Sequence, residues 1–501
     1  KAMTLYSQLD QAFSFYEPEF MEISEEQYAA FLEAQPKLQV YKHFFDKLLQ
    51  KKDHVLSQRE EELLAGAGEI FGAASETFAI LDNADISFPY VLDDEGNEVQ
   101  LSHGTYIRLM ESKNREVRRG AYEALYATYE QFQHTYAKTL QTNVKVQNYR
   151  AKVRNYKSAR HAALAANFVP ESVYDNLVAA VRKHLPLLHR YLNLRSKILG
   201  ISDLKMYDVY TPLSSVDYSF TYEEALKKAE EALAVLGDDY LSRVKRAFSE
   251  RWIDVYENEG KRSGAYSWGT YGSHPYVLLN FHGTLNDVFT LAHEMGHSIH
   301  SWYSDKNQPF TYAGYKIFVA EVASTCNEAL LIRHMLKKAG SREEKAYLLN
   351  HFLESFRGTL FRQTMFAEFE DMAHRKGAAG ESLTAQNLCQ MYRQLNVDYF
   401  GPEMNVDAQI DYEWERIPHF YTPFYVYQYA TGFSAAVAIS SRIMKGEEGA
   451  LEGYKKFLSG GCSMTPIDLL KLCGVDMSTT KPVDEALSFF GELLDEFEGQ
   501  R

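Results

Sequence analysis

Apolar side chains recur at intervals of three and four residues along most of the chain, a spacing typical of α-helices. Two helix-start signals stand in the first 80 residues, Ser24-Glu-Glu-Gln27 and Ser57-Gln-Arg-Glu60. Tyrosines follow the same spacing from about Arg115 to Arg154, which indicates packing between helices rather than a ligand platform. The pattern returns over residues 162–199, with Pro170 as a helix start. We therefore predict a mostly α-helical protein.

Two short stretches interrupt this pattern. Residues 86–102 place one apolar run before the turn Asp93-Asp-Glu-Gly-Asn97 and another after it, as in a β-hairpin. The run Tyr276-Val-Leu-Leu-Asn-Phe281 has the aromatic and β-branched residues of a short strand. A helix should follow it, because Thr284 can act as N-cap and Asp287 completes a capping pair three residues later. We expect a small β-sheet beside this helix.

The helix after Thr284 contains His293-Glu294-x-x-His297. Residues four apart lie one turn apart on the same helix face, so both imidazoles can bind one tetrahedral zinc ion. Glu294 is placed to accept a proton from a water molecule whose pKa the metal lowers to about 7. We therefore predict one catalytic zinc ion and hydrolytic chemistry, for which peptide bonds are the commonest target on this motif.

The third ligand separates the classes of zinc hydrolase. A metzincin would need Gly at position 300 and His at position 303, but the chain has His300 and Tyr303, which excludes that class. The remaining common arrangement is two histidines and a glutamate from a downstream helix. The candidates are Glu321 and Glu328.

Glu321 is our choice because it follows a loop that contains Gly314 and has small neighbours that let its helix approach the histidine helix. These neighbours are Ala320, Ala323 and Ser324. Glu328 lies two turns further along the same face and suits a carboxylate that orients a ligand histidine. Asp287 is an equally open candidate for that orienting role.

Several long motifs resemble the oligoendopeptidase F group of the thimet oligopeptidase family of zinc metallopeptidases. They are the runs at residues 263–280, 289–300, 321–325 and 417–432, and the resemblance covers essentially the whole chain. It implies a two-lobed helical clam with a deep central channel that admits unstructured oligopeptides and excludes folded proteins. Residues 1–200 would form a helical N-terminal lobe and residues 201–501 the catalytic lobe, with C-terminal helices crossing back. Since relatives are usually longer at the N-terminus, we expect this chain to lack an N-terminal helical portion.

The sheet next to the metal helix is a candidate site for substrate backbone. An exposed strand edge can pair with an extended peptide without reading its side chains. Gly264 and Ala265 would permit close approach of the peptide backbone, although both also fit an ordinary small sheet that covers helices.

The segment around residues 417–432 is a candidate for stabilising the tetrahedral oxyanion of amide hydrolysis. Thr422 and Pro423 predict a helix from Phe424 onward, which leaves His419 and Tyr421 on the preceding loop. We choose His419 and Tyr427 as hydrogen-bond donors to the oxyanion, since the family uses a His and nearby Tyr residues here. Tyr421 is the second candidate, because a residue before the helix can turn toward the metal.

Charge and cysteine content exclude some partners. The formal net charge is −15, with no Lys/Arg cluster of the kind that follows phosphates, so we expect no nucleic-acid partner. No apolar run approaches the length that spans a bilayer, and four scattered cysteines without CxxC spacing favour reduced thiols. We expect a cytoplasmic protein, and its oligomeric state stays open.

Together these features predict a zinc metalloendopeptidase in which Glu294 is the general base. A zinc carboxydipeptidase of the same family is the nearest alternative and would need a cationic anchor for the substrate's terminal carboxylate. A non-catalytic, zinc-stabilised peptide-binding protein is a further alternative, but a structural zinc site normally has four protein ligands. A serine or cysteine hydrolase is less compatible with the chain, since it has no GxSxG motif.

Overall fold

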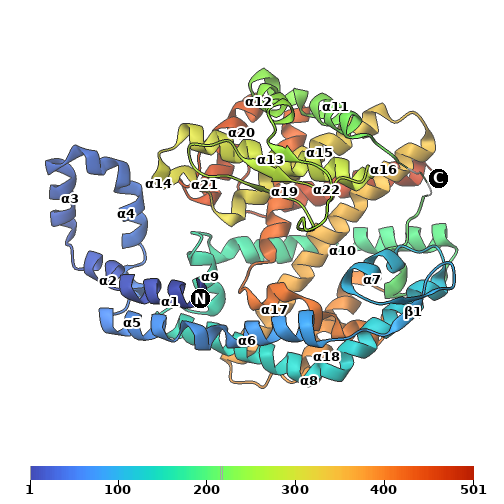
Figure 1. Cartoon of the computed structure of the whole chain (residues 1–501), viewed down its shortest axis with the longest axis horizontal. Helices are drawn as coiled ribbons and strands as arrows, with labels where there is room; N and C mark the ends of the chain where they lie inside the picture. Colours follow the sequence, from blue (N-terminus) through green and yellow to red (C-terminus); the bar gives the residue numbers. More distant parts are fainter. Residues whose placement is uncertain (1, 215, 217, 501) are drawn as a thin grey trace. The chain divides into compact units, whose positions relative to one another are not determined.

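The structure is a computed structural model that describes residues 2–214, 216 and 218–500 (Figure 1). Helices dominate the described residues, as predicted, and the chain forms two compact units that are each built from segments distant in sequence. Unit 1 comprises Lys1–Ala166, Phe369–Leu395 and Asp407–Tyr425. Unit 2 comprises Asn167–Glu368, Asn396–Val406 and Val426–Arg501. The predicted domain boundary near residue 200 and the two-lobed clam with its channel stay predictions.

Unit 1 is organised on its longest helix, α8 (Arg115–Val153), which packs against α6, α7 and η7. The other elements are α1 (Ala2–Phe13), α2 (Tyr16–Met21), α3 (Glu25–Ala34), η1 (Pro36–Tyr41), α4 (Lys42–Leu49), η2 (Lys52–His54), α5 (Gln58–Gly66), α6 (Gly68–Ile80), η3 (Leu81–Asp85), β1 (Tyr90–Leu92), β2 (Glu98–Gln100), α7 (His103–Met110), α9 (Ala159–Ala165), η7 (Gln409–Arg416) and η8 (Pro418–Tyr421).

The predicted features of unit 1 are confirmed. Ser24 and Ser57 each form a capping box with the residue three positions on. The hairpin β1–β2 is antiparallel, with Val91 opposite Val99. Four tyrosines of α8, Tyr122, Tyr126, Tyr129 and Tyr136, are core residues, whereas Tyr149 near the end of the helix is exposed. Tyr129 and Tyr136 donate hydrogen bonds to Asp82.

Unit 2 is built around the helices α13, α15 and α19, which pack on one another in the order α13–α15–α19. Its elements are α10 (Glu171–Leu199), η4 (Met206–Asp208), α11 (Tyr222–Leu233), η5 (Ala234–Leu236), α12 (Gly237–Ser249), β3 (Ile253–Asp254), β4 (Tyr266–Trp268), β5 (Tyr276–Leu278), α13 (Leu285–Asn307), α14 (Phe310–Ala313), α15 (Ile317–Lys338), α16 (Arg342–Ser355), η6 (Phe356–Phe361), α19 (Tyr427–Met444), α20 (Ala450–Leu458), α21 (Pro466–Lys471) and α22 (Lys481–Gly499). Two further helices, α17 (Arg362–Ala378) and α18 (Ala385–Phe400), are divided between the units.

A three-stranded sheet lies next to α13, as the sequence predicts. Its strand order is β3–β5–β4, with β5 parallel to β3 and antiparallel to β4. Val277 of β5 is buried, whereas its neighbour Tyr276 is exposed, so the sheet has one core face and one solvent face. β4 is an edge strand and keeps one row of backbone groups without a strand partner.

Candidate metal centre

Helix α13 begins where its sequence predicts. The Thr284 hydroxyl accepts the backbone N–H of Asp287 at 3.2 Å, and Asp287 Oδ2 accepts the backbone N–H of Thr284 at 2.8 Å. Asp287 Oδ2 also accepts the backbone N–H of His282. The Asp287 carboxylate therefore caps the helix, so the structure gives it a different task from orienting a metal ligand.

Close packing between α13 and α15 is what brings the metal-ligand candidates together. A Cβ atom on Gly296 would lie 2.5 Å from Ser324 Cα and 2.7 Å from the Ala323 carbonyl oxygen. Such distances are far shorter than van der Waals contact, so only glycine permits this approach. The small residues Ala323 and Ser324 match the reasoning that selected Glu321, but the need for Gly296 was missed. The position of Gly296, between the two histidines of the motif, was the sequence signal that could have indicated this close approach.

Three side chains converge on one point between these helices. The Nε2 atoms of His293 and His297 lie 3.2 Å apart, and Glu321 Oε2 lies 3.4 Å from the first and 3.6 Å from the second. Two ligands bound about 2.0–2.1 Å from a tetrahedral ion lie about 3.3–3.4 Å from each other. The three atoms therefore have the spacing of three corners of a tetrahedron. Among the described His, Cys, Asp and Glu residues, they form the group that could hold a metal ion.

The charges of the cluster suit a cation. Burial opposes a positive charge on His293, but its hydrogen bonds with Glu321 and Glu328 outweigh this and raise the pKa of His293 well above 6.5. Burial and the neighbouring His293 lower the pKa of His297 to about 4. Burial opposes ionisation of Glu321 as well, yet the two histidines lower its pKa to about 2. The carboxylate thus stays ionised, and one positive charge is held between it and the imidazoles.

Glu328 contacts the other side of the same ligand imidazole. Its Oε1 lies 3.2 Å from His293 Nδ1, so it can accept the Nδ1–H bond and leave the Nε2 lone pair free for the cluster. Glu328 lies two helical turns beyond Glu321, as the sequence indicates. The two carboxylates therefore contact opposite nitrogens of the His293 ring.

Glu294 lies in the same helix turn and is 6% exposed. One of its oxygens, Oε2, has no hydrogen-bond partner among the described residues. Burial raises the pKa of Glu294 to about 7, with His293 opposing the rise and Glu321 and Glu328 adding to it. A buried carboxylate with a free oxygen and a pKa near neutrality can accept and return a proton.

The edge strand β4 is attached directly to α13. Ser267 Oγ lies 2.8 Å from Ser298 Oγ, and the Ser267 backbone N–H is close enough to Glu294 to oppose the rise of its pKa. Gly264 precedes the strand with φ +86°, and its carbonyl accepts a hydrogen bond from the Asn280 side chain. A Cβ atom on Gly264 would meet nothing within 4 Å, so there is open space beside Gly264, whereas Ala265 is half-buried. The serine pair was not predicted, since two serines in distant motifs give no sequence signal.

The aromatic segment after residue 417 differs from its prediction. The helix expected from Phe424 begins at Tyr427 instead, because Phe424 has φ +52° and its N–H donates to the buried Glu370. A left-handed residue interrupts helical geometry, so residues 422–426 form turns. Thr422 accordingly ends the short helix η8 rather than capping a new one.

The three candidate residues of this segment have separate surroundings. In unit 1, His419 stacks on Tyr425, and the Tyr421 hydroxyl lies 2.7 Å from the Thr139 hydroxyl with its ring stacked on Phe78. In unit 2, Tyr427 is 1% exposed, and its ring packs on Phe318 and Tyr174.

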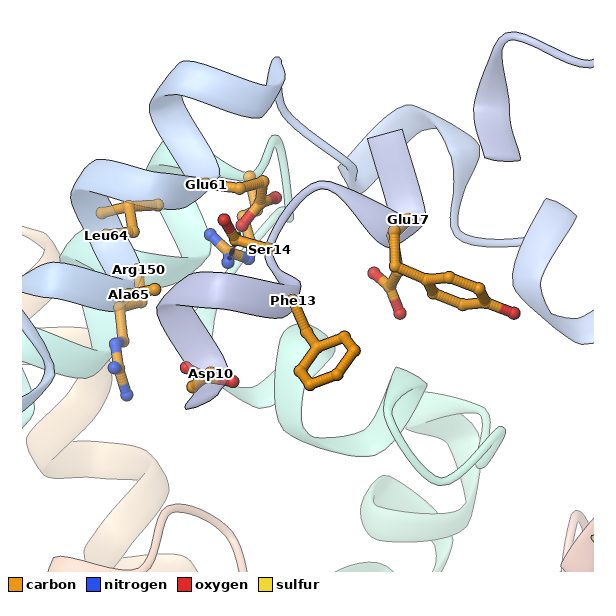
Figure 2. A pocket seen from close by; sticks show the side chains of 10 residues that line it. Asp10, Phe13, Ser14, Glu17, Glu61, Leu64, Ala65 and Arg150 are labelled. Carbon is orange, nitrogen blue, oxygen red and sulfur yellow. Dashed lines mark hydrogen bonds and ion pairs between the residues drawn. The ribbon is translucent and has the colours of Figure 1, made fainter. Parts of the chain in front are cut away.

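Unit 1 also has a cavity of about 620 Å³ between α1, α5 and α8 (Figure 2). Its polar lining includes the ion pair of Arg154 with Glu61 at 2.5 Å, together with Asp10 and Arg150. No histidine or cysteine is among the described residues that line it. Its carboxylates are not part of the group of described residues that lie close enough together to hold a metal ion, which is His293, His297 and Glu321.

Comparison with known proteins places the chain. The sequence profile of peptidase family M3 matches residues 108–489, more than half of the 501 residues. The chain belongs to peptidase family M3. A second profile, described as Oligopeptidase F, matches residues 19–88 of this M3 peptidase. The resemblance stated from the sequence motifs is confirmed.

Relatives of this M3 peptidase match nearly its whole length. It is 54% identical over 498 residues to Group B oligopeptidase PepB of Streptococcus agalactiae, covering 99% of this chain and 83% of that protein. It is 50% identical over 499 residues to oligopeptidase PepF of Bacillus subtilis, covering 99% and 74%. The crystal structure of oligoendopeptidase-F from Enterococcus faecium aligns with a TM-score of 0.84 at 42% identity, covering 100% of this chain and 85% of that one.

These relationships establish the class of the enzyme. This M3 peptidase is a metalloendopeptidase that requires a metal cofactor and acts on peptides. The mostly α fold with small sheets agrees with that of its relatives. No helix among the described residues is both long enough and apolar enough to cross a membrane.

Proposed function

We propose that this M3 peptidase is a zinc metalloendopeptidase that hydrolyses internal bonds of unstructured oligopeptides. One observation carries the proposal: His293, His297 and Glu321 offer two imidazole nitrogens and one carboxylate oxygen at the mutual distances of a single tetrahedral ion. Three such ligands with a fourth position open to water or substrate are typical of catalytic zinc. Mg²⁺ and Ca²⁺ prefer sites made of oxygen ligands, so the donor set favours zinc over them.

The proposed mechanism assigns one proton path to Glu294. When bound, zinc supplies Lewis acidity that polarises the scissile carbonyl and lowers the pKa of water. Glu294 Oε2, which has no hydrogen-bond partner among the described residues, accepts the proton of the attacking water and later donates it to the amine that leaves. Glu328 orients His293 through Nδ1.

The remaining roles follow the sequence motifs. We propose His419 and Tyr427 as donors to the oxyanion, with Tyr421 as the second candidate. The buried position of Tyr427 against Phe318 and Tyr174 supports a fixed place for its hydroxyl oxygen. We propose Gly264 and Ala265 as residues that contact the substrate backbone, and the open space at Gly264, next to the edge strand β4, supports pairing with an extended peptide.

Substrate size and location are also proposals. The names of the relatives, oligopeptidase and oligoendopeptidase, support peptides of limited length as substrates. All four cysteines are free thiols, which is usual for proteins of reducing compartments and supports the cytoplasm as the place of action.

The test uses one internally quenched peptide of about ten residues in two forms, with a blocked and with a free C-terminus. The protein is stripped with a chelator and restored with zinc, magnesium or buffer, and products are mapped by mass spectrometry. We expect zinc alone to restore internal cleavage of both forms at similar rates. Removal of C-terminal dipeptides from the free form only would indicate a carboxydipeptidase. Zinc binding without cleavage of either form would indicate a zinc-stabilised binding protein.

A further inference from the structure

A cavity of about 330 Å³ lies within unit 2, between α13, α15 and α16. Its large lining residues are the apolar Phe289, Ile332, Phe352 and Phe433, of which each is at most 7% exposed. Smaller polar and titratable residues complete the lining: Asn286, Thr290, Thr325, Glu328, His351 and Ser355. This volume is at the lower end for ligand pockets, which span about 300–1,000 Å³, and suits one large side chain.

The cavity adjoins the metal cluster. Phe289 and Thr290, which line it, precede His293 by four and three residues on the same helix and so lie one turn away on its face. Glu328 lines the cavity too, and its Oε1 is in contact with His293 Nδ1. The cavity therefore begins directly behind a metal-ligand candidate.

The direction of β4 indicates which part of a peptide would reach this cavity. Gly264, just before the strand, accepts a hydrogen bond from Asn280, which precedes α13 in the chain. Ser267 in the strand contacts Ser298 in the middle of α13. Tyr271, beyond the strand, donates to the carbonyl of Gln308 at the end of α13. β4 and α13 therefore run in the same direction. A peptide pairing antiparallel to β4, the more stable pairing, runs from the end of α13 toward its start. The residues after the scissile bond then pass over Thr290 and Phe289.

The polar groups of the cavity limit its choice of side chain. The Glu328 side chain is 34% exposed and places a carboxylate at the wall. Burial lowers the pKa of His351, whose ring packs 4.6 Å from Phe289. No Lys or Arg is among the described residues that line the cavity. An acidic side chain would thus meet like charge with no cation to pair with it.

We infer that this cavity is the subsite for the residue that follows the scissile bond, the P1′ residue, and that it selects large apolar side chains and rejects acidic ones. The inference rests on the proposed endopeptidase function. A substrate bond is then chosen by the residue on its C-terminal side, while β4 binds the backbone without regard to sequence.

The test compares blocked peptides that differ only at P1′, with Leu, Phe, Ala, Asn or Asp there, and measures kcat/KM at the mapped bond. Since one methylene in an apolar pocket can contribute about 10-fold or more and Leu and Phe exceed Ala by several carbons, we expect Leu and Phe to exceed Ala by at least about 100-fold. Asp should be about 10-fold poorer than its isostere Asn. The same substitutions at P1 should have smaller effects.

Ala329→Met fills the cavity from α15, since Ala329 lines it and is 2% exposed. We expect the Phe/Ala ratio at P1′ to fall at least about 10-fold, with hydrolysis of the Ala peptide and metal content retained. Ala438→Met is the matched control, because Ala438 lines a different cavity of unit 2 and is 4% exposed. Ile332→Ala, which enlarges the cavity, should raise the rate for a P1′ Trp peptide relative to Leu.

Two results would overturn the subsite assignment while leaving the endopeptidase function intact. One is internal cleavage with an unchanged P1′ ratio in both Ala329→Met and Ile332→Ala. The other is a changed ratio at P1 instead of P1′, which would mean that the peptide runs parallel to β4. Absence of cleavage of every peptide by the zinc-loaded wild type would overturn the proposed function and the subsite together.

Discussion

The metal cluster and the aromatic segment at residues 417–427 are held by different kinds of backbone. His293 and His297 lie on the unbroken helix α13, and Glu321 lies on α15, which packs against it. His419 and Tyr421 lie on the short helix η8, which is followed by turns and by Phe424 at φ +52° before α19 begins. On a regular helix the spacing in sequence fixes the spacing in space, whereas in an irregular segment each side chain depends on its own tertiary contacts.

The largest effect should come from the cluster. Glu294→Gln keeps the size of the side chain but cannot accept a proton, so kcat should fall about 10²–10⁴-fold with metal content unchanged. Steady-state kinetics with the quenched peptide and metal analysis of the same sample measure this. Asp305→Asn, the same change near the other end of α13, should leave kcat within about 2-fold. A Glu294→Gln variant that keeps more than a tenth of the rate would remove Glu294 from the mechanism.

The aromatic segment should give a somewhat smaller effect if its residues stabilise the oxyanion. His419→Ala and Tyr427→Phe each remove one donor, for which about 10²–10³-fold in kcat is the usual loss, with little change in KM. Tyr429→Phe, in the first turn of α19, is the control and should behave like wild type. A rise in KM with kcat preserved would show that the residue binds ground-state substrate instead.

The contact that joins the two helices of the cluster should come next. Gly296→Ala adds a methyl group that would overlap Ser324, so α15 must move away and carry Glu321 with it. We expect about 1–3 kcal/mol of destabilisation and roughly a 10-fold or greater loss of zinc affinity, measured by thermal unfolding and competition with a chelator. Gly314→Ala is the matched control, because a Cβ there meets nothing within 4 Å. Equal zinc affinity in both variants would show that close approach is not needed.

The difference between regular helices and irregular segments also explains which features could be predicted from the sequence. The helix start at Thr284, the shared face of the histidines and the small residues beside Glu321 all follow from local rules, and the structure agrees with each. The predicted start of α19 at Phe424 is wrong because the N–H of Phe424 donates to Glu370, a partner 54 residues away that no local pattern indicates. The close approach at Gly296 and the cavity behind His293 likewise depend on which helices pack together. The roles of His419, Tyr421 and Tyr427 stay predictions.

The smallest effect should come from a carboxylate that contrasts with those of the cluster. Glu415 lies two residues before Ile417, where the aromatic segment begins, and it is 1% exposed. Neither of its carboxylate oxygens has a hydrogen-bond partner among the described residues. Burial raises the pKa of Glu415 to about 9, and the charge of Glu130 adds to this. Glu321, by comparison, has histidine partners that lower its pKa.

A raised carboxyl pKa means that the folded protein holds a proton that the unfolded chain releases above about pH 4.5. The contribution of Glu415 to wild-type stability should therefore decrease as pH rises from about 5 to 9, and Glu415→Gln, which cannot ionise, should lack this decrease. We expect the Tm of the variant minus that of wild type to become more positive over this range, by several degrees in total. Glu76→Gln, an exposed site on α6, should show no such trend. A Tm difference that stays constant with pH would mean that Glu415 ionises normally in the folded protein, through a partner such as water.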